Sequence, residues 1–163
     1  MAAEDRPGDG LASYARYGIH IDAPIDHVWD LNADCRRMPE WDVNTIEVKD
    51  CPDRIDRVGA RYTSVSRVMG RNLTGTSETT KVDKPRLLEQ KVALPGGGHA
   101  TITVTFAEAG GGTDETITVD YELPGGLFAG VAVRLLSGSI QRDIRHSNEN
   151  FKALCEATVA VHA

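Results

Sequence analysis

The chain has 163 residues, of which 40% are hydrophobic and 26% are charged, and this composition suits one globular domain with a substantial core. Its formal net charge of −6 and the lack of any Lys/Arg cluster argue against a nucleic-acid partner. No apolar run reaches the roughly 18 residues of a membrane span, and the N-terminus lacks the basic-then-apolar pattern of a secretion signal. We therefore expect a soluble, cytoplasmic protein without stable membrane insertion.

The sulfur and imidazole side chains show no spacing typical of a metal site. Cys35, Cys51 and Cys155 form no CxxC pair, and an odd number of cysteines in an apparently cytosolic chain predicts free thiols. The five histidines are scattered, and the glycine-rich nucleotide motifs and the serine-hydrolase elbow are missing. We expect neither a metal ion nor a cofactor.

The N-terminal third predicts a disordered start, one strand and two short helices. Residues 1–12 are polar and contain Gly and Pro, so we expect them to be disordered and residues 13–160 to form a single domain. Residues 14–22 alternate apolar with polar side chains, which predicts a strand. Pro24 ends this strand and begins a short helix with Ile25, Val28 and Trp29 on its apolar side. A second short helix or turn follows over 32–40.

From residue 43 onward the apolar period is two, which predicts strands in succession. Turn sequences rich in Gly, Pro and Asp separate them, and the predicted strands are 43–49, 60–69, 73–82, 87–94, 100–106 and 115–123. Strands joined by such short connections form an antiparallel meander.

The last element is a helix predicted over residues 127–160, because this stretch has no proline and its apolar residues recur in steps of three and four. Leu136, Ile140, Ile144 and Phe151 belong to the apolar stripe. Ser137-Gly138-Ser139 interrupts it, and glycine costs about 1 kcal/mol relative to alanine inside a helix. Either the interruption marks a kink or a close approach to a strand, or its small side chains leave room for a ligand.

Several short motifs, in this order and spacing, resemble the START / polyketide cyclase superfamily, whose fold is also called helix-grip or birch-pollen-allergen-like. They are the run from Ile19 to Asp30 with its Ala23-Pro24 and Val28-Trp29 pairs, Asp34, Pro39-Glu40-Trp41, Val58-Gly59 and Gly112-Thr113. The resemblance covers roughly residues 14–157. It implies an α+β fold with a curved seven-stranded antiparallel sheet around a long C-terminal helix, two short helices between the first and second strands, and a deep, mostly apolar cavity.

Strand alternation then predicts which side chains face that cavity. On the third strand we choose Tyr62, Ser64, Ser66 and Val68, although the opposite register is open. On the fourth strand, an inward Val82 implies the same inward side for Thr80, Glu78, Thr76 and Thr74. The residues expected to contact a ligand are Trp41, Tyr62, Thr76, Glu78, Gln90, Val104, Tyr121, Leu136, Ser139 and Ile140.

Glu78 is the most consequential of these residues. A carboxylate facing the interior is costly, so its pKa would rise or a cation would pair with it, and it could then act as an acid or base. The alternative is a solvated carboxylate near the sheet edge or the cavity mouth. Gln90 and Tyr121 could supply hydrogen bonds that orient a ligand.

The resemblance implies several functions. In aromatase/cyclase members, catalysis is attributed to an arginine and hydroxyl groups on the fourth strand, but this chain has no arginine there, so we predict no catalytic residue. We expect binding or transport of a hydrophobic small molecule such as a lipid, polyketide or other natural product. The alternatives are a polyketide cyclase or dehydratase that uses Glu78 and Tyr121 for proton transfer, an antibiotic-sequestering resistance protein, and a protein-interaction module.

Overall fold

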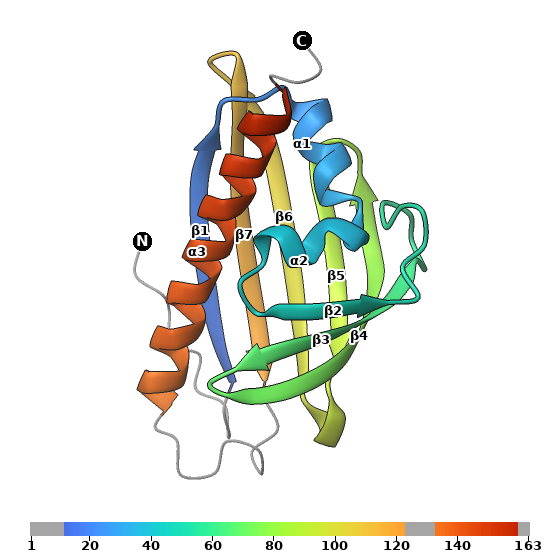
Figure 1. Ribbon diagram of the computed structural model, residues 1–163, viewed down its shortest axis with the longest axis vertical. Coiled ribbons are helices and arrows are strands. Elements are labelled where there is room, and N and C mark those ends of the chain that lie inside the picture. The colour runs from blue at the N-terminus through green and yellow to red at the C-terminus, as the bar shows by residue number, and fades with distance from the viewer. Residues whose placement is uncertain (1–11, 123–132, 160–163) are drawn as a thin grey trace.

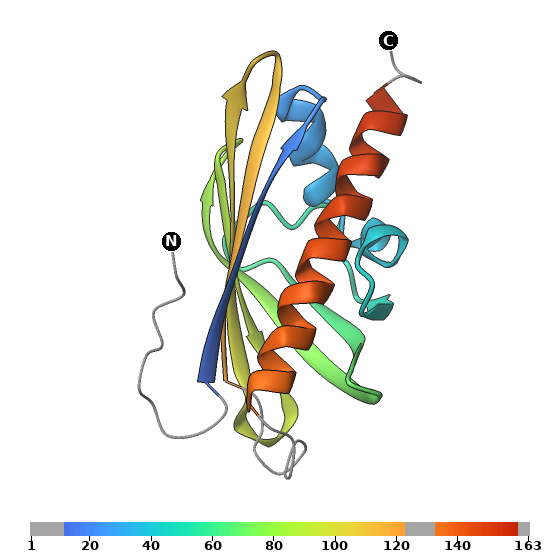
Figure 2. The ribbon, with the colours of Figure 1, turned by 90° about the vertical axis from the view of Figure 1, so that its left-hand side faces the viewer.

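Seven antiparallel strands form one curved sheet that wraps around the long helix α3 in the computed structural model, which describes residues 12–122 and 133–159 (Figures 1 and 2). The strands are β1 (Ala12–Ile21), β2 (Thr45–Lys49), β3 (Arg61–Val68), β4 (Arg71–Asp83), β5 (Leu87–Ala93), β6 (His99–Ala109) and β7 (Gly112–Glu122). The helices are α1 (Ile25–Asn32), η1 (Cys35–Arg37), α2 (Met38–Trp41), η2 (Pro95–Gly97) and α3 (Val133–Val159). This arrangement confirms the predicted helix-grip fold.

The strand order β1-β7-β6-β5-β4-β3-β2 follows from the chain order. Strands β2 to β7 pair with their successors as a meander, and β1 then pairs antiparallel with β7 along its whole length, from Ala12 opposite Glu122 to Ile21 opposite Thr113. The sheet therefore ends at β1 and β2, and its concave face is left to the helices. Of the predicted disordered segment 1–12, only Ala12 lies within the described residues.

Helix α3 covers the concave face of the sheet (Figure 2), and it buries residues of the predicted apolar stripe. Leu136, Phe151 and Cys155 are buried, while the first residues of the predicted helix, 127–132, lie outside the described part of the chain. Gly138 is exposed, and a Cβ built on it would meet nothing within 4 Å. A close approach to a strand is therefore not the reason for this glycine.

At one end of the space between sheet and α3, large side chains fill the core. The ring of Trp29 on α1 meets Phe106 on β6 edge to face, with ring centroids 5.9 Å apart. The ring of Phe151 on α3 lies 5.0 Å from that of Trp41. The indole N–H of Trp29 donates to Asp56 at 2.9 Å, so burial of this ring leaves no polar atom without a partner.

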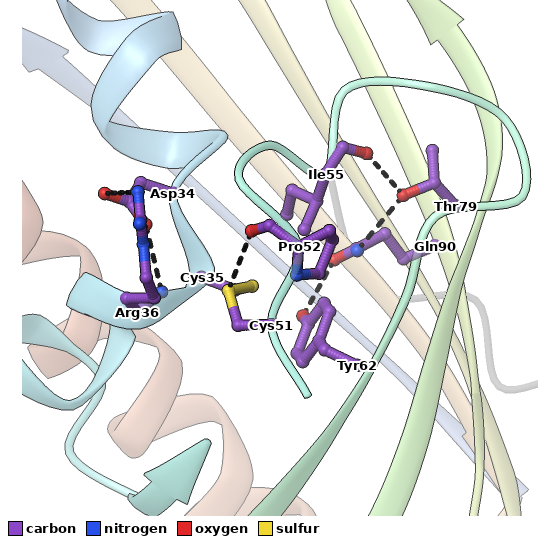
Figure 3. Close-up of a disulfide and its surroundings, with 9 residues drawn as sticks. All are labelled: Asp34, Cys35, Arg36, Cys51, Pro52, Ile55, Tyr62, Thr79 and Gln90. Carbon is purple, nitrogen blue, oxygen red and sulfur yellow. Dashed lines mark hydrogen bonds and ion pairs between the residues drawn. A yellow bond between two sulfur atoms is a disulfide. The ribbon is translucent and has the colours of Figure 1, made fainter. Parts of the chain in front are cut away.

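A disulfide joins Cys35 in η1 to Cys51, just after β2, with Cα atoms 6.1 Å apart (Figure 3). The prediction of free thiols is therefore wrong for these two residues, because the fold brings the two segments side by side. Among the described residues only Cys155 is free, and it is buried. The bridge ties η1 to the long β2–β3 connection, in which the Ile55 N–H donates to the Ala33 carbonyl.

None of the helices in the described ranges is long and apolar enough to cross a membrane.

Candidate functional site

A cavity of about 260 Å³ lies between the inner face of the sheet, α2 and the middle of α3. Most of its wall is apolar and comes from β5, β6 and β7, with Leu88, Val104 and Ile117 as examples, and from Ile140 and Ile144 on α3. Well-packed interiors leave few voids larger than a water molecule, so a cavity of this size is a feature of the fold that needs an explanation.

The cavity exists because small side chains occupy the inner face of the neighbouring strands. Ser64 on β3 and Gly75 and Ser77 on β4 line it. A Cβ at Gly75 would meet side-chain atoms of Val92 at 3.0 Å and Leu94 at 3.2 Å, so this position is already closely surrounded. Short side chains on two adjacent strands leave the space that aromatic rings fill at the other end.

A chain of hydrogen bonds connects three residues of the cavity wall through Thr79, which lies behind them in β4 (Figure 3). The three residues, Ile55, Tyr62 and Gln90, are called the cavity floor below. The Tyr62 hydroxyl donates to Oε1 of Gln90 at 3.2 Å, Nε2 of Gln90 donates to the Thr79 hydroxyl at 3.4 Å, and that hydroxyl donates to the Ile55 carbonyl at 2.7 Å. Burial raises the pKa of Tyr62, and the negative charge of Asp42 adds to this effect. The phenol therefore stays protonated at neutral pH and fixes the orientation of the Gln90 amide.

Asp42 brings a carboxylate to the cavity wall from the C-terminal end of α2. Its Oδ1 accepts from the Ser147 hydroxyl of α3 at 2.9 Å and from the Asn44 N–H at 3.3 Å, and its Oδ2 accepts from the Thr45 hydroxyl. The Ser147 oxygen in turn accepts from the Val43 N–H. This network couples α2 and the start of β2 to α3 at the cavity.

Trp41 also lines the cavity. Its Nε1 is buried and has no hydrogen-bond partner within the described residues, which is unusual for an indole N–H in a protein interior. The described residues therefore leave this buried donor without a partner.

Six of the residues predicted to contact a ligand line this cavity, and their contact with a ligand stays a prediction. They are Trp41, Tyr62, Gln90, Val104, Tyr121 and Ile140. Leu136 is buried in a neighbouring core cluster with Ala15 and Leu73, and Ser139 is half-exposed on α3, where Arg142 donates to it at 3.4 Å. Neither Leu136 nor Ser139 belongs to the cavity wall.

The predicted inward positions of Thr76 and Glu78 are wrong. A β-bulge between Thr79 and Lys81 adds a residue to β4, and such an addition exchanges the two faces of a strand. Val82 packs toward the core as predicted, but on the other side of the bulge the inward residues include Gly75 and Ser77. Thr76 is exposed, and the Glu78 carboxylate forms a 2.7 Å ion pair with Arg61.

Sequence reasoning missed the part of the site that involves Asp42 and Ser147. Ser147 falls on the apolar stripe of α3, and a polar residue in a buried stripe needs a partner. Its partner, Asp42, lies 105 residues earlier in the chain, and no local sequence pattern predicts a contact over that separation.

Sequence reasoning also missed Glu115, which is buried on the inner face of β7, two residues before Ile117. Burial raises its pKa to about 8, and its Oε2 has no hydrogen-bond partner within the described residues. It does not belong to the cavity wall. The buried thiol of Cys155 has its pKa raised by burial and, further, by the charge of Glu115. No group of side chains in the described part of the chain could hold a metal ion.

The comparisons with known proteins agree with this geometry. The family model described as polyketide cyclase / dehydrase and lipid transport matches residues 15–156. No curated protein matches the chain.

Solved structures with the same fold come from bacteria and plants. A protein of Thermus thermophilus is 21% identical with a TM-score of 0.71, over 89% of this chain and 98% of its own. The Zhui aromatase/cyclase from a Streptomyces species is 17% identical with a TM-score of 0.71, over 89% and 94%. The major latex-like protein 151 of Panax ginseng is 14% identical with a TM-score of 0.63, over 88% and 97%.

At these identities the solved structures show a shared fold, while the family model covers most of the chain. The chain therefore belongs to the polyketide cyclase / dehydrase and lipid transport family.

Proposed function

We propose that this protein binds a hydrophobic small molecule in the cavity between the sheet and α3. The observation that carries the proposal is the cavity itself, about 260 Å³ with a mostly apolar wall and a few fixed polar groups. Small-molecule sites typically have this composition, because apolar surface supplies affinity and a few polar groups supply orientation.

The apolar wall is sufficient to support binding. Each methylene group transferred from water contributes about 0.8 kcal/mol, so a chain of about ten methylenes would contribute about 8 kcal/mol before the entropic costs of association. The polar groups are already ordered by bonds within the protein, as in the pair formed by Tyr62 and Gln90. Their fixed geometry lowers the cost of orienting a ligand.

A cyclase or dehydratase reaction is the alternative, and the family and the shared fold of the Streptomyces aromatase/cyclase favour it. Polarisation of a ligand carbonyl would require a donor in the cavity. No Lys, Arg or His lines the cavity in the described ranges, so a neutral hydroxyl or amide donor of the wall would have to serve. We therefore propose binding or transport, and treat turnover as a separate outcome of the test.

Native mass spectrometry of the protein purified from its own host, followed by organic extraction, tests the proposal. We expect the wild type to retain a hydrophobic metabolite, and the cavity-filling variant Ser64→Phe to lose it. Thr63→Phe, on the outer face of the same strand, is the matched control and should retain it.

Recovery of the retained molecule in altered form after incubation would establish turnover. If Ser64→Phe retains the same molecule, the molecule binds outside this cavity, which would contradict the proposal. An empty wild type with no thermal shift across lipids and polyketides would contradict the proposed binding.

A further inference from the structure

Among the described residues, the cavity wall carries a single charged group, and its charge is negative. Asp42 is the only ionisable carboxyl among the described residues that line it, and no Lys, Arg or His lines it in those residues. The stretch 123–132 is also free of charged residues in the sequence. The negative charge of Asp42 reaches the cavity floor, where it contributes to the raised pKa of Tyr62.

Asp42 can accept a further hydrogen bond. A carboxylate has about four lone-pair sites, two on each oxygen. Among the described residues, Oδ1 already accepts from Ser147 and Asn44, whereas Oδ2 accepts only from Thr45. One site on Oδ2 is therefore left for a donor on a bound molecule.

The other polar groups of the wall do not provide a counter-charge for an anion. The proton of the Tyr62 hydroxyl is donated to Gln90, and that of the Ser147 hydroxyl to Asp42. The Trp41 Nε1–H is neutral as well, and this atom is buried. An ionised ligand carboxylate would enter an apolar cavity beside a like charge and without a cation.

A ligand's polar end therefore meets very different environments according to its charge. Burial of an unpaired ion is costly, and a like charge nearby adds to the cost. A hydroxyl group can donate to Oδ2 without bringing a charge into the cavity. An amine can donate to Oδ2 and, when protonated, also neutralises the carboxylate.

We propose that Asp42 selects the ligand by its polar end, so that the cavity takes a hydrophobic molecule that carries a hydroxyl or amine group and rejects one that carries a carboxylate. This selectivity rests on the proposed binding function and specifies the ligand class for the same cavity. Asp42 is a specificity-determining residue in this account, and no chemical step is assigned to it.

Three ligands that share one alkyl chain test the proposal. Decan-1-ol, decylamine and decanoate are titrated calorimetrically into the oxidised wild-type protein, below the concentrations at which they form micelles. We expect decan-1-ol and decylamine to bind, and decanoate to bind at least about tenfold more weakly than decan-1-ol.

Substitution of Asp42 measures how much its carboxylate contributes to the selectivity. Asp42→Asn should weaken the binding of decylamine by about tenfold. It should also reduce the difference in affinity between decanoate and decan-1-ol. Glu47→Gln removes the same charge from β2 at an exposed position, where Glu47 pairs with Lys49 at 3.7 Å, and should leave all three affinities unchanged. Asp42→Glu, which restores the charge, should restore the preference at least in part.

The outcomes separate this proposal from the binding function. Absence of binding for all three ligands would contradict the proposed function itself. Decanoate binding as tightly as decan-1-ol to the wild type would overturn the selectivity while binding stands. The wild-type series decides the matter even if Asp42→Asn melts too low to be titrated.

Discussion

The two ends of the space between the sheet and α3 differ in the size of the side chains that enter it. At the end that α1 covers, Trp29, Phe106 and Phe151 fill the space, and each is almost fully buried. At the other end Ser64, Gly75 and Ser77 face the helix, and a cavity remains. The backbone frame is continuous over both ends (Figure 2). The difference shows that side-chain volume, and not the helix-grip frame itself, decides where this fold is hollow.

The largest expected effect comes from emptying the filled end. Phe151→Ala should lower the free energy of unfolding by about 3 to 5 kcal/mol, because a closely packed aromatic side chain leaves a void that its neighbours cannot close. Ile144→Ala at the hollow end should cost only about 1 kcal/mol, since this half-buried side chain already borders empty space. Urea unfolding of the two variants measures the contrast, and equal losses would contradict the comparison.

Glu115→Gln tests the filled end with a substitution that should raise stability at high pH. Because burial raises the pKa of Glu115 to about 8 from 4.5, the folded protein holds a proton that the unfolded chain releases above pH 4.5. Stability should therefore fall as pH rises between these values, by about 3 to 4 kcal/mol between pH 5 and pH 8.

In Glu115→Gln this part of the pH dependence should be missing, and the variant should be more stable than the wild type at pH 8. Unfolding free energies at both pH values measure the effect. Parallel pH profiles for the two proteins would show that Glu115 does not titrate as its burial implies.

Loss of the disulfide should have the next largest effect. Cys35→Ser with Cys51→Ser should lower the unfolding free energy by about 3 kcal/mol, because the bridge closes a loop with a sequence separation of 16. The oxidised wild type, in which the bridge is intact, is the reference. A wild type whose thermal midpoint does not respond to a dithiol reductant would contradict this prediction.

Glu78→Gln should have the smallest effect. Its ion pair with Arg61 lies on the outer face, with the two side chains 40% and 66% exposed, and exposed pairs contribute about 0 to 1 kcal/mol. Ligand affinity should not change, because Glu78 does not line the cavity. An affinity loss in a normally folded Glu78→Gln would show that the β4 register in solution differs from that of the structure.

The sequence carried enough information to predict the strand order and most of the inward faces. Alternation placed Gln90 and Val104 correctly, as it did Tyr62 on β3, because β3, β5 and β6 run without interruption on those faces. Alternation failed on β4, since one extra residue at the bulge after Thr79 has no signature in the residue pattern. The Asp42–Ser147 contact and the Cys35–Cys51 bridge are set by tertiary packing, which periodicity does not encode.

The most direct test of the hollow end is a fluorescence titration with N-phenyl-1-naphthylamine, a neutral dye that brightens in apolar surroundings. The wild type and Thr63→Phe should bind the dye with the same affinity and stoichiometry of about one. In Ser64→Phe, a phenyl ring occupies part of the cavity, and binding should weaken by at least about tenfold. Unchanged binding by a folded Ser64→Phe would contradict the central claim that this cavity is the ligand site.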